Sequence, residues 1–151
     1  MPKESVTRLI ECKKENLIDL VLDIEKYPEF VPFCLGSKVY ERSIEENQTL
    51  IVADLTIGKG PFKDTYKSDV QFNKRTNSIK VTNIGGPLRH LENNWKFIES
   101  DKGTEILFDI DFEIENKFLN IVMTKSFQYG LNKIADAFQK RAQDLYQSTK
   151  N

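Results

Sequence analysis

Histidine and cysteine, the residues that most often carry nucleophilic and metal chemistry, are scarce in this sequence. It has one histidine, His90, and two cysteines, Cys12 and Cys34, in 151 residues. A Ser-His-Asp or Cys-His arrangement would have to use His90, which follows the Gly85-Gly86-Pro87 break and is predicted to lie on a loop. One histidine and two distant cysteines lack the paired spacing of zinc sites. We therefore expect no catalytic residue and no metal site.

The sequence also lacks an excess of charge of one sign and any long hydrophobic run. The formal net charge is −1, from 22 basic and 23 acidic side chains, whereas proteins that coat nucleic acid are usually basic. No apolar stretch approaches the length that crosses a membrane, and the first residues do not resemble a signal peptide. These features predict a cytoplasmic protein with free thiols and no DNA partner.

Aromatic side chains and two long periodic segments are what the sequence does contain. Ten Phe, five Tyr and one Trp are enough to build a core. Residues 37–115 alternate with period two between turn residues, and residues 118–145 carry apolar side chains at helical spacing. Consecutive strands joined by short turns favour an antiparallel sheet with a helix packed on one face. We predict an α+β fold in which residues 1–151 form a single domain.

The predicted elements follow in the order strand, two short helices, about six strands and a long helix. The first strand is expected over residues 5–12. Asn16 is expected to begin a helix that ends just before Pro28, because proline disfavours helix at the residue before it. Residues 27–34 contain two prolines and are expected to form a short helical turn or a tight loop. Residues 58–61 are expected to interrupt the strands.

The clearest single element is the strand that ends near residue 115. Its apolar side chains face one way: Ile106, Phe108, Ile110, Phe112 and Ile114. Its acidic side chains face the other way: Asp109, Asp111, Glu113 and Glu115. These carboxylates are ~7 Å apart along an extended strand, so we interpret them as a solvated face and not as a cation site.

The last helix has a basic side, formed by Lys125, Lys133, Lys140 and Arg141. The simpler interpretation is solvation, with favourable charge near the helix C-terminus. The alternative is an anionic partner, such as ribosomal RNA or a membrane surface. The aromatic residues leave a similar choice, because they can either fill a core or line an apolar cavity between helix and sheet. Gly130 is the one weak point within this helix.

A family resemblance bears on these alternatives. Residues 27–39 read Tyr-Pro-Glu-Phe-Val-Pro-Phe-Cys-Leu-Gly-Ser-Lys-Val and closely resemble the signature of the coenzyme Q-binding START-domain family. Other strings agree in order: Lys59-Gly60 with Phe62, Trp95-Lys96-Phe97, Phe112-Glu113 with Asn116, and Phe138 with Arg141-Ala142 and Tyr146. The family often has Trp at the position of Phe33 and Gly in place of Asn93-Asn94. These departures affect pocket shape and ligand preference, and they leave the fold intact.

The resemblance implies a helix-grip fold, a curved antiparallel sheet wrapped round the long C-terminal helix, with a hydrophobic cavity between them. It also implies that ubiquinone or a similar polyisoprenoid lipid is the bound ligand, with no cofactor and no catalysis. The segment 27–33 is our candidate for the pocket mouth. The ligand-binding candidates are Phe30, Phe33, Phe62, Tyr66, Val70, Trp95, Phe97, Phe108, Ile110, Phe112, Leu131, Ile134 and Phe138.

The family includes mitochondrial coenzyme Q-binding proteins and bacterial relatives, some described as ribosome association toxins of the RatA type. Our leading hypothesis is a bacterial carrier or chaperone for a quinone of the respiratory chain. It would be cytoplasmic, with transient contact at the inner membrane. The first alternative is a toxin that binds a ribosomal subunit and blocks subunit association. The second is a cyclase-type enzyme, which shares this fold. We rank it last, because His90 is the only histidine and the sequence shows no close acid–base pair.

Overall fold

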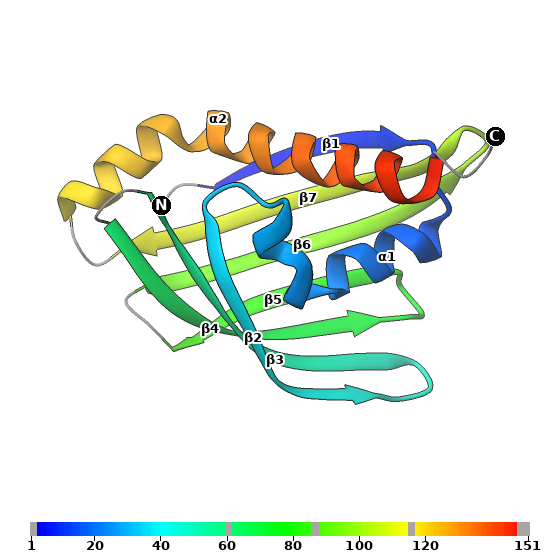
Figure 1. Cartoon of the computed structure of the whole chain (residues 1–151), viewed down its shortest axis with the longest axis horizontal. Coiled ribbons are helices and arrows are strands. Elements are labelled where there is room, and N and C mark those ends of the chain that lie inside the picture. The colour runs from blue at the N-terminus through cyan, green and yellow to red at the C-terminus, as the bar shows by residue number, and fades with distance from the viewer. Residues whose placement is uncertain (1–2, 60–61, 86–87, 115–116, 148–151) are drawn as a thin grey trace.

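The computed structural model describes residues 3–59, 62–85, 88–114 and 117–147. Within these ranges a few side chains are outside the description, among them Phe62, Phe112 and those of residues 117–129. The elements, in chain order, are β1 (Lys3–Ile10), α1 (Lys14–Leu22), the 3-10 helix η1 (Ile24–Glu29), β2 (Cys34–Ile44), β3 (Gln48–Lys59), β4 (Phe62–Asn73), β5 (Ser78–Gly85), β6 (Leu88–Ser100), β7 (Gly103–Ile114), α2 (Lys117–Ala142) and the short π-helical turn η2 (Gln143–Gln147). This confirms the predicted order (Figure 1).

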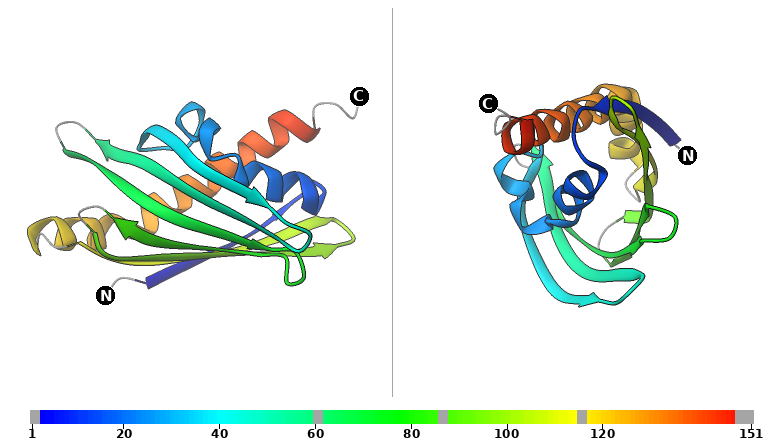
Figure 2. Two further views of the ribbon diagram at one scale, coloured as in Figure 1. Left: turned by 90° about the horizontal axis from the view of Figure 1, so that it is seen from below. Right: turned by 90° about the vertical axis from the view of Figure 1, so that its right-hand side faces the viewer.

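One antiparallel sheet of seven strands forms the body of the molecule. Its order is β1-β7-β6-β5-β4-β3-β2, so β2 to β7 form a meander and β1 pairs with β7 at the far edge. The sheet curves round the helices, and α2 crosses its open side, as the end-on view in Figure 2 shows. The predicted fold class, a curved antiparallel sheet gripping a long C-terminal helix, is therefore confirmed.

The core lies between the concave face of the sheet and the two α-helices. Helix α1 buries Leu17, Ile18, Leu20 and Val21, and it occupies the same end of the concave face as the β6–β7 turn (Figure 2). Helix α2 contributes Leu131, Phe138 and Ala142 to the same core. Helical spacing predicted these three buried positions of α2 correctly.

Three predicted features at the N-terminal end differ from the structure. The first strand ends at Ile10, so Cys12 lies in the bend before α1. Asn16 does not begin α1, because the helix starts at Lys14 after an extended Lys13 without a side-chain cap. Burial of its apolar face decides where this helix begins. Pro28 does not end α1 either, since α1 stops at Leu22 and Pro28 lies within η1.

Two further expectations about the strands need correction. His90 lies within β6, where it pairs with Glu113 of β7, and not on a loop. The expected break at residues 58–61 is narrower than predicted, because β3 continues to Lys59, which pairs with Phe62. A tight hairpin lets pairing continue up to its turn, whatever the glycine content of the strand end. Residues 60–61 themselves lie outside the described residues.

Candidate functional site

The inward-facing residues of β3 become steadily more exposed along the strand. Ile51 and Ala53 are 0% and 1% exposed, Leu55 is half-buried, and Ile57 is 37% exposed. They share one face because side chains two residues apart on a strand point the same way. The concave face is therefore filled at the β2–β3 hairpin end and opens toward the Ile57 end.

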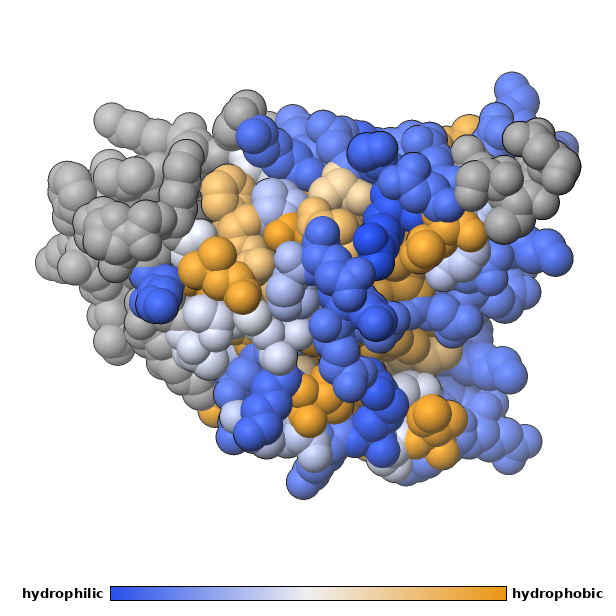
Figure 3. Space-filling view, viewed as in Figure 1, coloured by the Kyte–Doolittle hydropathy of each residue, from blue (hydrophilic) through white to orange (hydrophobic). Residues whose placement is uncertain are grey.

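Strands β6 and β7 show the same gradient in the same direction. Their inward-facing residues at the filled end are buried: Phe97, Trp95, Ile106 and Phe108. Further along, the inward-facing residues are half-buried: Asn93, Leu91 and Ile110. We call this region the open half of the concave face, and define it by Leu55, Ile57, Tyr66, Asn83, Leu91, Asn93 and Ile110. In the view of Figure 3, apolar surface is visible left of centre, beside the grey atoms.

At the filled end, aromatic side chains pack round Phe138 of α2. The Trp95 ring is 5.1 Å from the Phe138 ring and stacks on Phe108 at 4.1 Å. Phe30 and Tyr27 meet Phe138 edge-on at 5.1 and 5.5 Å. Such edge-on contacts are favourable beyond the area that they bury. This cluster joins η1 and its C-terminal flank to the sheet through α2.

The space that remains among these side chains is small. A cavity of about 20 Å³ lies between β1, β6, β7 and α2, lined by apolar groups that include Val6, Trp95 and Phe138. That volume corresponds to roughly one water molecule. A lipid tail cannot enter the filled end without displacing the aromatic cluster.

Two polar interactions hold η1 in place. The Tyr27 hydroxyl donates a hydrogen bond to the Val21 carbonyl, and burial raises the pKa of Tyr27 well above its ordinary range. An Arg141 Nη2 donates to Glu29 Oε1 at 2.8 Å, and the guanidinium lies over the Phe30 ring at 5.0 Å. The hydrogen bond from Arg141 lowers the pKa of the Glu29 carboxyl. The predicted pocket mouth is thus tied to α2.

Phe33 adopts an unusual backbone conformation at the end of this segment. Its φ is +67°, in the left-handed region that bulky residues rarely occupy. Its carbonyl accepts a hydrogen bond from the Gly58 N–H at 2.9 Å, which joins the start of β2 to the end of β3. Backbone strain of this kind is found mainly where the surrounding structure enforces it, often at ligand sites.

The predicted ligand-binding residues fall into three groups. Those buried in the close-packed core are Val70, Trp95, Phe97, Phe108, Leu131 and Phe138. Those that are half-buried are Phe30 and Phe33 in or beside the η1 segment, Tyr66 and Ile110 in the open half, and Ile134 of α2, which packs against the core. The side chains of Phe62 and Phe112 lie outside the described residues. Sequence reasoning overlooked Leu55, Ile57, Asn83, Leu91 and Asn93, although strand parity places all of them on the inward face.

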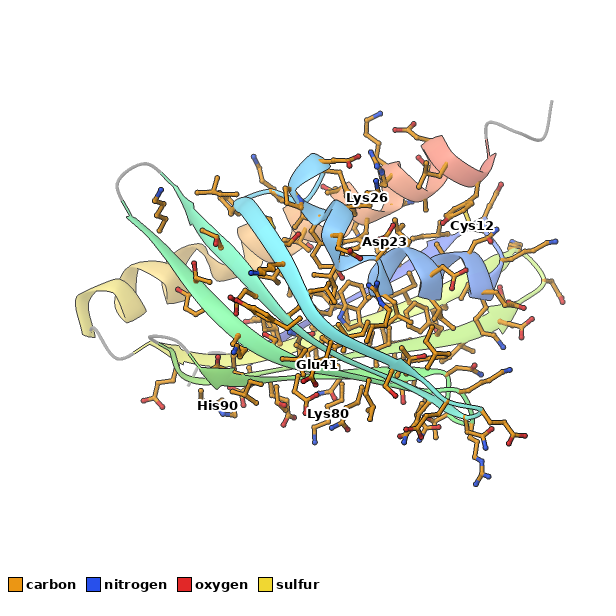
Figure 4. The ribbon with its side chains drawn as sticks, turned by 60° about the horizontal axis from the view of Figure 1, so that its bottom comes forward. Cys12, Asp23, Lys26, Glu41, Lys80 and His90 are labelled. Carbon is orange, nitrogen blue, oxygen red and sulfur yellow. The ribbon has the colours of Figure 1, made fainter. Side chains whose placement is uncertain are left out.

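Of the residues with the greatest chemical reactivity, His90 and Cys12 lie away from the open half, whereas Cys34 pairs with Ile57 at its edge. His90 Nε2 is 3.5 Å from Asp111 Oδ2, and His90 points away from the helices on the outer face of the sheet (Figure 4). Cys12 and Cys34 are buried, and burial raises the pKa of the Cys34 thiol. In the described part of the chain, no group of three or more His, Cys, Asp or Glu could hold a metal ion.

A membrane-spanning helix needs a certain length and apolar character. None of the helices in the described residues is both long enough and apolar enough to cross a membrane.

The curved sheet, the C-terminal helix across it and the partly open concave face define the helix-grip fold of START-like proteins. A START superfamily protein from Mycobacterium smegmatis has the same fold, with a TM-score of 0.80 over 96% of this chain and 99% of that one at 19% identity. The solution structure of an 18 kDa protein from Caulobacter crescentus also gives a TM-score of 0.80, at 26% identity over 96% and 98% of the two chains.

Residues 11–139 match the family described as polyketide cyclase / dehydrase and lipid transport, and the chain belongs to that family. A ribosome association toxin RatA from Rickettsia prowazekii is 31% identical over 92% of this chain and 94% of its own length. A mitochondrial coenzyme Q-binding protein from Dictyostelium discoideum is 27% identical over 97% of this chain and 71% of its own. The resemblance seen in the sequence is thereby confirmed.

Proposed function

We propose that this protein binds a hydrophobic ligand, ubiquinone or another polyisoprenoid lipid, in the open half of the concave face, and that it carries this ligand for respiratory electron transport. The observation that carries the proposal is the exposure gradient along β3, from Ile51 at 0% to Ile57 at 37%. Apolar side chains that remain partly exposed on an inward face stabilise a complex when a ligand covers them. The gain is ~25 cal/mol per Å² of apolar area buried. The similarity to a coenzyme Q-binding protein supports the choice of ligand.

Binding without catalysis is part of the same proposal. Ligand pockets need apolar walls and a few polar groups, whereas acid–base catalysis needs a titratable group close to the reacting atoms. The seven residues that define the open half include no histidine, cysteine or carboxylate, and His90 lies on the opposite face. Cys34 and Asp64 pair with Ile57 at the edge of this region. We further propose that loading and delivery involve transient contact with a membrane surface.

Organic extraction of the protein purified from a quinone-making host, followed by mass spectrometry, tests this proposal. We expect a quinone or isoprenoid lipid close to one molecule per chain. A folded protein that carries no lipid, and that takes up none when decylubiquinone is added, would contradict the proposal.

Ribosome binding is the second candidate function, favoured by the similarity to a ribosome association toxin. Helix α2 exposes Lys133 and Lys140, and Lys140 Nζ lies 3.6 Å from Asp144 Oδ2. If these lysines contact RNA phosphates, binding should weaken as salt rises. Lys133→Glu with Lys140→Glu should then release the protein from ribosomal subunits in co-sedimentation.

The matched control carries the same change of charge on the outer face of the sheet, Lys80→Glu with Lys96→Glu. Both control lysines are exposed. Equal loss of binding in the two double variants would mean that net charge alone matters. If ribosome binding is unchanged by salt and by both double variants, an electrostatic contact through α2 is excluded.

A further inference from the structure

Strands β2 and β5 are irregular near the open half, and each irregularity coincides with an exposed large side chain. The pairing of β2 with β3 shifts at Leu35 and again at Tyr40, and the pairing of β5 with β4 shifts at Ile84. Leu35 is 55% exposed, Ile84 is 53% exposed and Tyr40 is 46% exposed. Bulges redirect a side chain and are frequent beside functional sites. These three side chains are therefore candidates for contact with a partner.

Lysine side chains lie between these exposed residues on the outer face of the sheet. Lys38 of β2 pairs with Asp54 of β3, which pairs in turn with Lys67 of β4. Lys67 stands at the register shift beside Ile84. Lys63 lies on the same face of β4, ~14 Å from Lys67 along the strand. All three lysines are exposed, so their charges are presented to solvent.

Tyr40 organises the charged groups of this region. Its hydroxyl donates a hydrogen bond to Asp54, and the Nζ atoms of Lys38 and Lys67 lie over its ring, 5.0 and 4.7 Å from the centroid. Such cation–π contacts position ammonium groups without neutralising their charge. With Lys63, three lysines stand against the one carboxylate of Asp54, which leaves this group of residues positively charged.

The β6–β7 half of the outer face has the opposite character. It carries carboxylates that include Glu92 of β6 and Asp109 and Asp111 of β7, and Lys80 Nζ of β5 lies 3.7 Å from Glu92 Oε1. The chain has a net charge of only −1, so its charges are segregated along the sheet. An anionic surface attracts the β2–β4 half and repels the β6–β7 half, and this difference orients the molecule.

The cationic region and the open half occupy opposite faces of the same strand segments. Thr56 lies next to Ile57 along β3, and its hydroxyl is 2.8 Å from that of Thr65, which stands between Lys63 and Lys67 on β4. Neighbouring residues of a strand point to opposite faces. Contact made through the cationic side therefore brings the exposed Ile57 end of the open half close to the surface that is contacted.

We propose that this region docks on the headgroups of anionic phospholipids, and that Leu35 and Ile84 enter the headgroup layer. We call it the docking surface, and define it by Leu35, Lys38, Tyr40, Lys63, Lys67 and Ile84. Lysines near an anionic membrane, a tyrosine at headgroup level and apolar side chains below it are the elements of interfacial binding. RNA phosphates would use the lysines but would gain little from the exposed leucine and isoleucine.

This inference rests on the proposed function and adds the partner and the surface through which the ligand is loaded and delivered. Flotation of the full chain with vesicles tests it. One set contains phosphatidylcholine and phosphatidylglycerol in equal parts, and the other contains phosphatidylcholine alone. We expect binding at least about tenfold tighter to the anionic vesicles, because each lysine near such a surface adds attraction. This binding should weaken as salt rises.

The variant Lys38→Glu with Lys63→Glu tests the electrostatic part of the contact. It should weaken binding to the anionic vesicles at least about tenfold. The matched control is Lys80→Glu with Lys96→Glu, which makes the same change of net charge at exposed positions outside the docking surface. This control should stay within about twofold of the native protein, since screening limits the effect of distant charges.

The variant Leu35→Ser with Ile84→Ser tests the apolar part of the contact. It should weaken binding to the anionic vesicles about fivefold or more, because less apolar area is then removed from water. The matched control is Ile98→Ser with Leu107→Ser, two exposed apolar residues on the outer face of β6 and β7. All four positions are exposed, so both variants should remain folded, and the control should bind like the native protein.

The remaining outcomes separate the inference from the proposed function. If the native protein takes up decylubiquinone but binds no vesicles, or if each variant binds them like its control, the inference is overturned and a lipid-binding function stands. Release of Lys38→Glu with Lys63→Glu from ribosomal subunits, with vesicle binding intact, would overturn the inference in favour of RNA. Vesicle binding that depends on the docking surface, in a protein that takes up no decylubiquinone, would support the inference and contradict the proposed function alone.

Discussion

Gly103 and Gly130 differ in what surrounds their α-carbons. Gly103, at the start of β7, has φ +137°, and a Cβ added there would meet the Ile10 carbonyl oxygen at 2.2 Å. Gly130 lies inside α2, and a Cβ added there would meet nothing within 4 Å. The first glycine is required by the close approach of β1 to the β6–β7 turn. The second only lowers the helix propensity of α2.

Gly130→Ala should therefore stabilise the protein by ~0.5–1 kcal/mol, because alanine reduces the entropy lost when the helix forms. Gly103→Ala should destabilise it by at least ~1 kcal/mol, since neither the backbone conformation nor the Ile10 carbonyl tolerates a Cβ. Chemical unfolding of both variants measures the two changes. A destabilising Gly130→Ala would mean that the helix needs a glycine for a reason other than its own backbone.

At the scale of elements, η1 depends on α2 and α1 for its position. Its ring contacts reach Phe138, its carboxylate Glu29 reaches Arg141, and its Tyr27 hydroxyl reaches the last turn of α1. An isolated 3-10 helix of this length has little stability of its own. Substitution of the buried Tyr27 therefore measures how strongly η1 is attached to the rest of the molecule.

Tyr27→Phe should destabilise the protein by about 1 kcal/mol at neutral pH, because the Val21 carbonyl loses its donor. Burial raises the pKa of Tyr27 in the folded state above the ordinary tyrosine value of about 10. The folded state then holds this proton more tightly than the unfolded state. The resulting stability is fully present below pH ~10 and is lost as the pH rises above it.

Unfolding curves from pH 8 to 11 should consequently fall more steeply for the native protein than for Tyr27→Phe. The comparison variant is Tyr40→Phe, because Tyr40 is 46% exposed and its hydroxyl donates to Asp54. It should alter the alkaline slope less, because solvent weakens this interaction. Identical slopes for the native protein and Tyr27→Phe would show that Tyr27 ionises freely, and hence that η1 opens readily.

At the scale of the whole molecule, the concave face has a filled end and an open half, and the proposed function places the ligand in the open half. A ligand that binds the folded state alone stabilises it, by about 2.7 kcal/mol at a free concentration 100 times the dissociation constant. Decylubiquinone should therefore raise the melting temperature of the native protein.

Two aspartate variants on β7 locate this effect. Ile110→Asp places a charge on the inward face in the open half and should abolish the thermal shift. Leu107→Asp places the same charge on the outer face, where Leu107 is 36% exposed, and should keep it. Circular dichroism confirms that both variants are folded. An undiminished shift in a folded Ile110→Asp would place the ligand elsewhere.

Periodicity in the sequence was sufficient to determine the order of the elements and, for β7 and α2, the face that each presents. The alternation of Ile106, Phe108 and Ile110 identified the inward face of β7, and the spacing of Leu131 and Phe138 identified the buried side of α2. Local side-chain patterns follow directly from the geometry of strands and helices, so they are visible without a partner. The family string at residues 27–39 added the fold to which these elements belong.

How deeply each inward-facing residue of a strand is buried was decided only by the tertiary structure. Strand parity treats Ile51 and Ile57 alike, yet one is fully buried and the other 37% exposed, because α1 fills one end of the concave face and not the other. For the same reason Trp95 and Phe97 lie in the core while Asn93 borders the open half. His90 likewise sits in a strand because β7 pairs with it. The register of the strands and the covering of the sheet by α1 arise from contacts between segments distant in the sequence. A local sequence pattern does not contain this information.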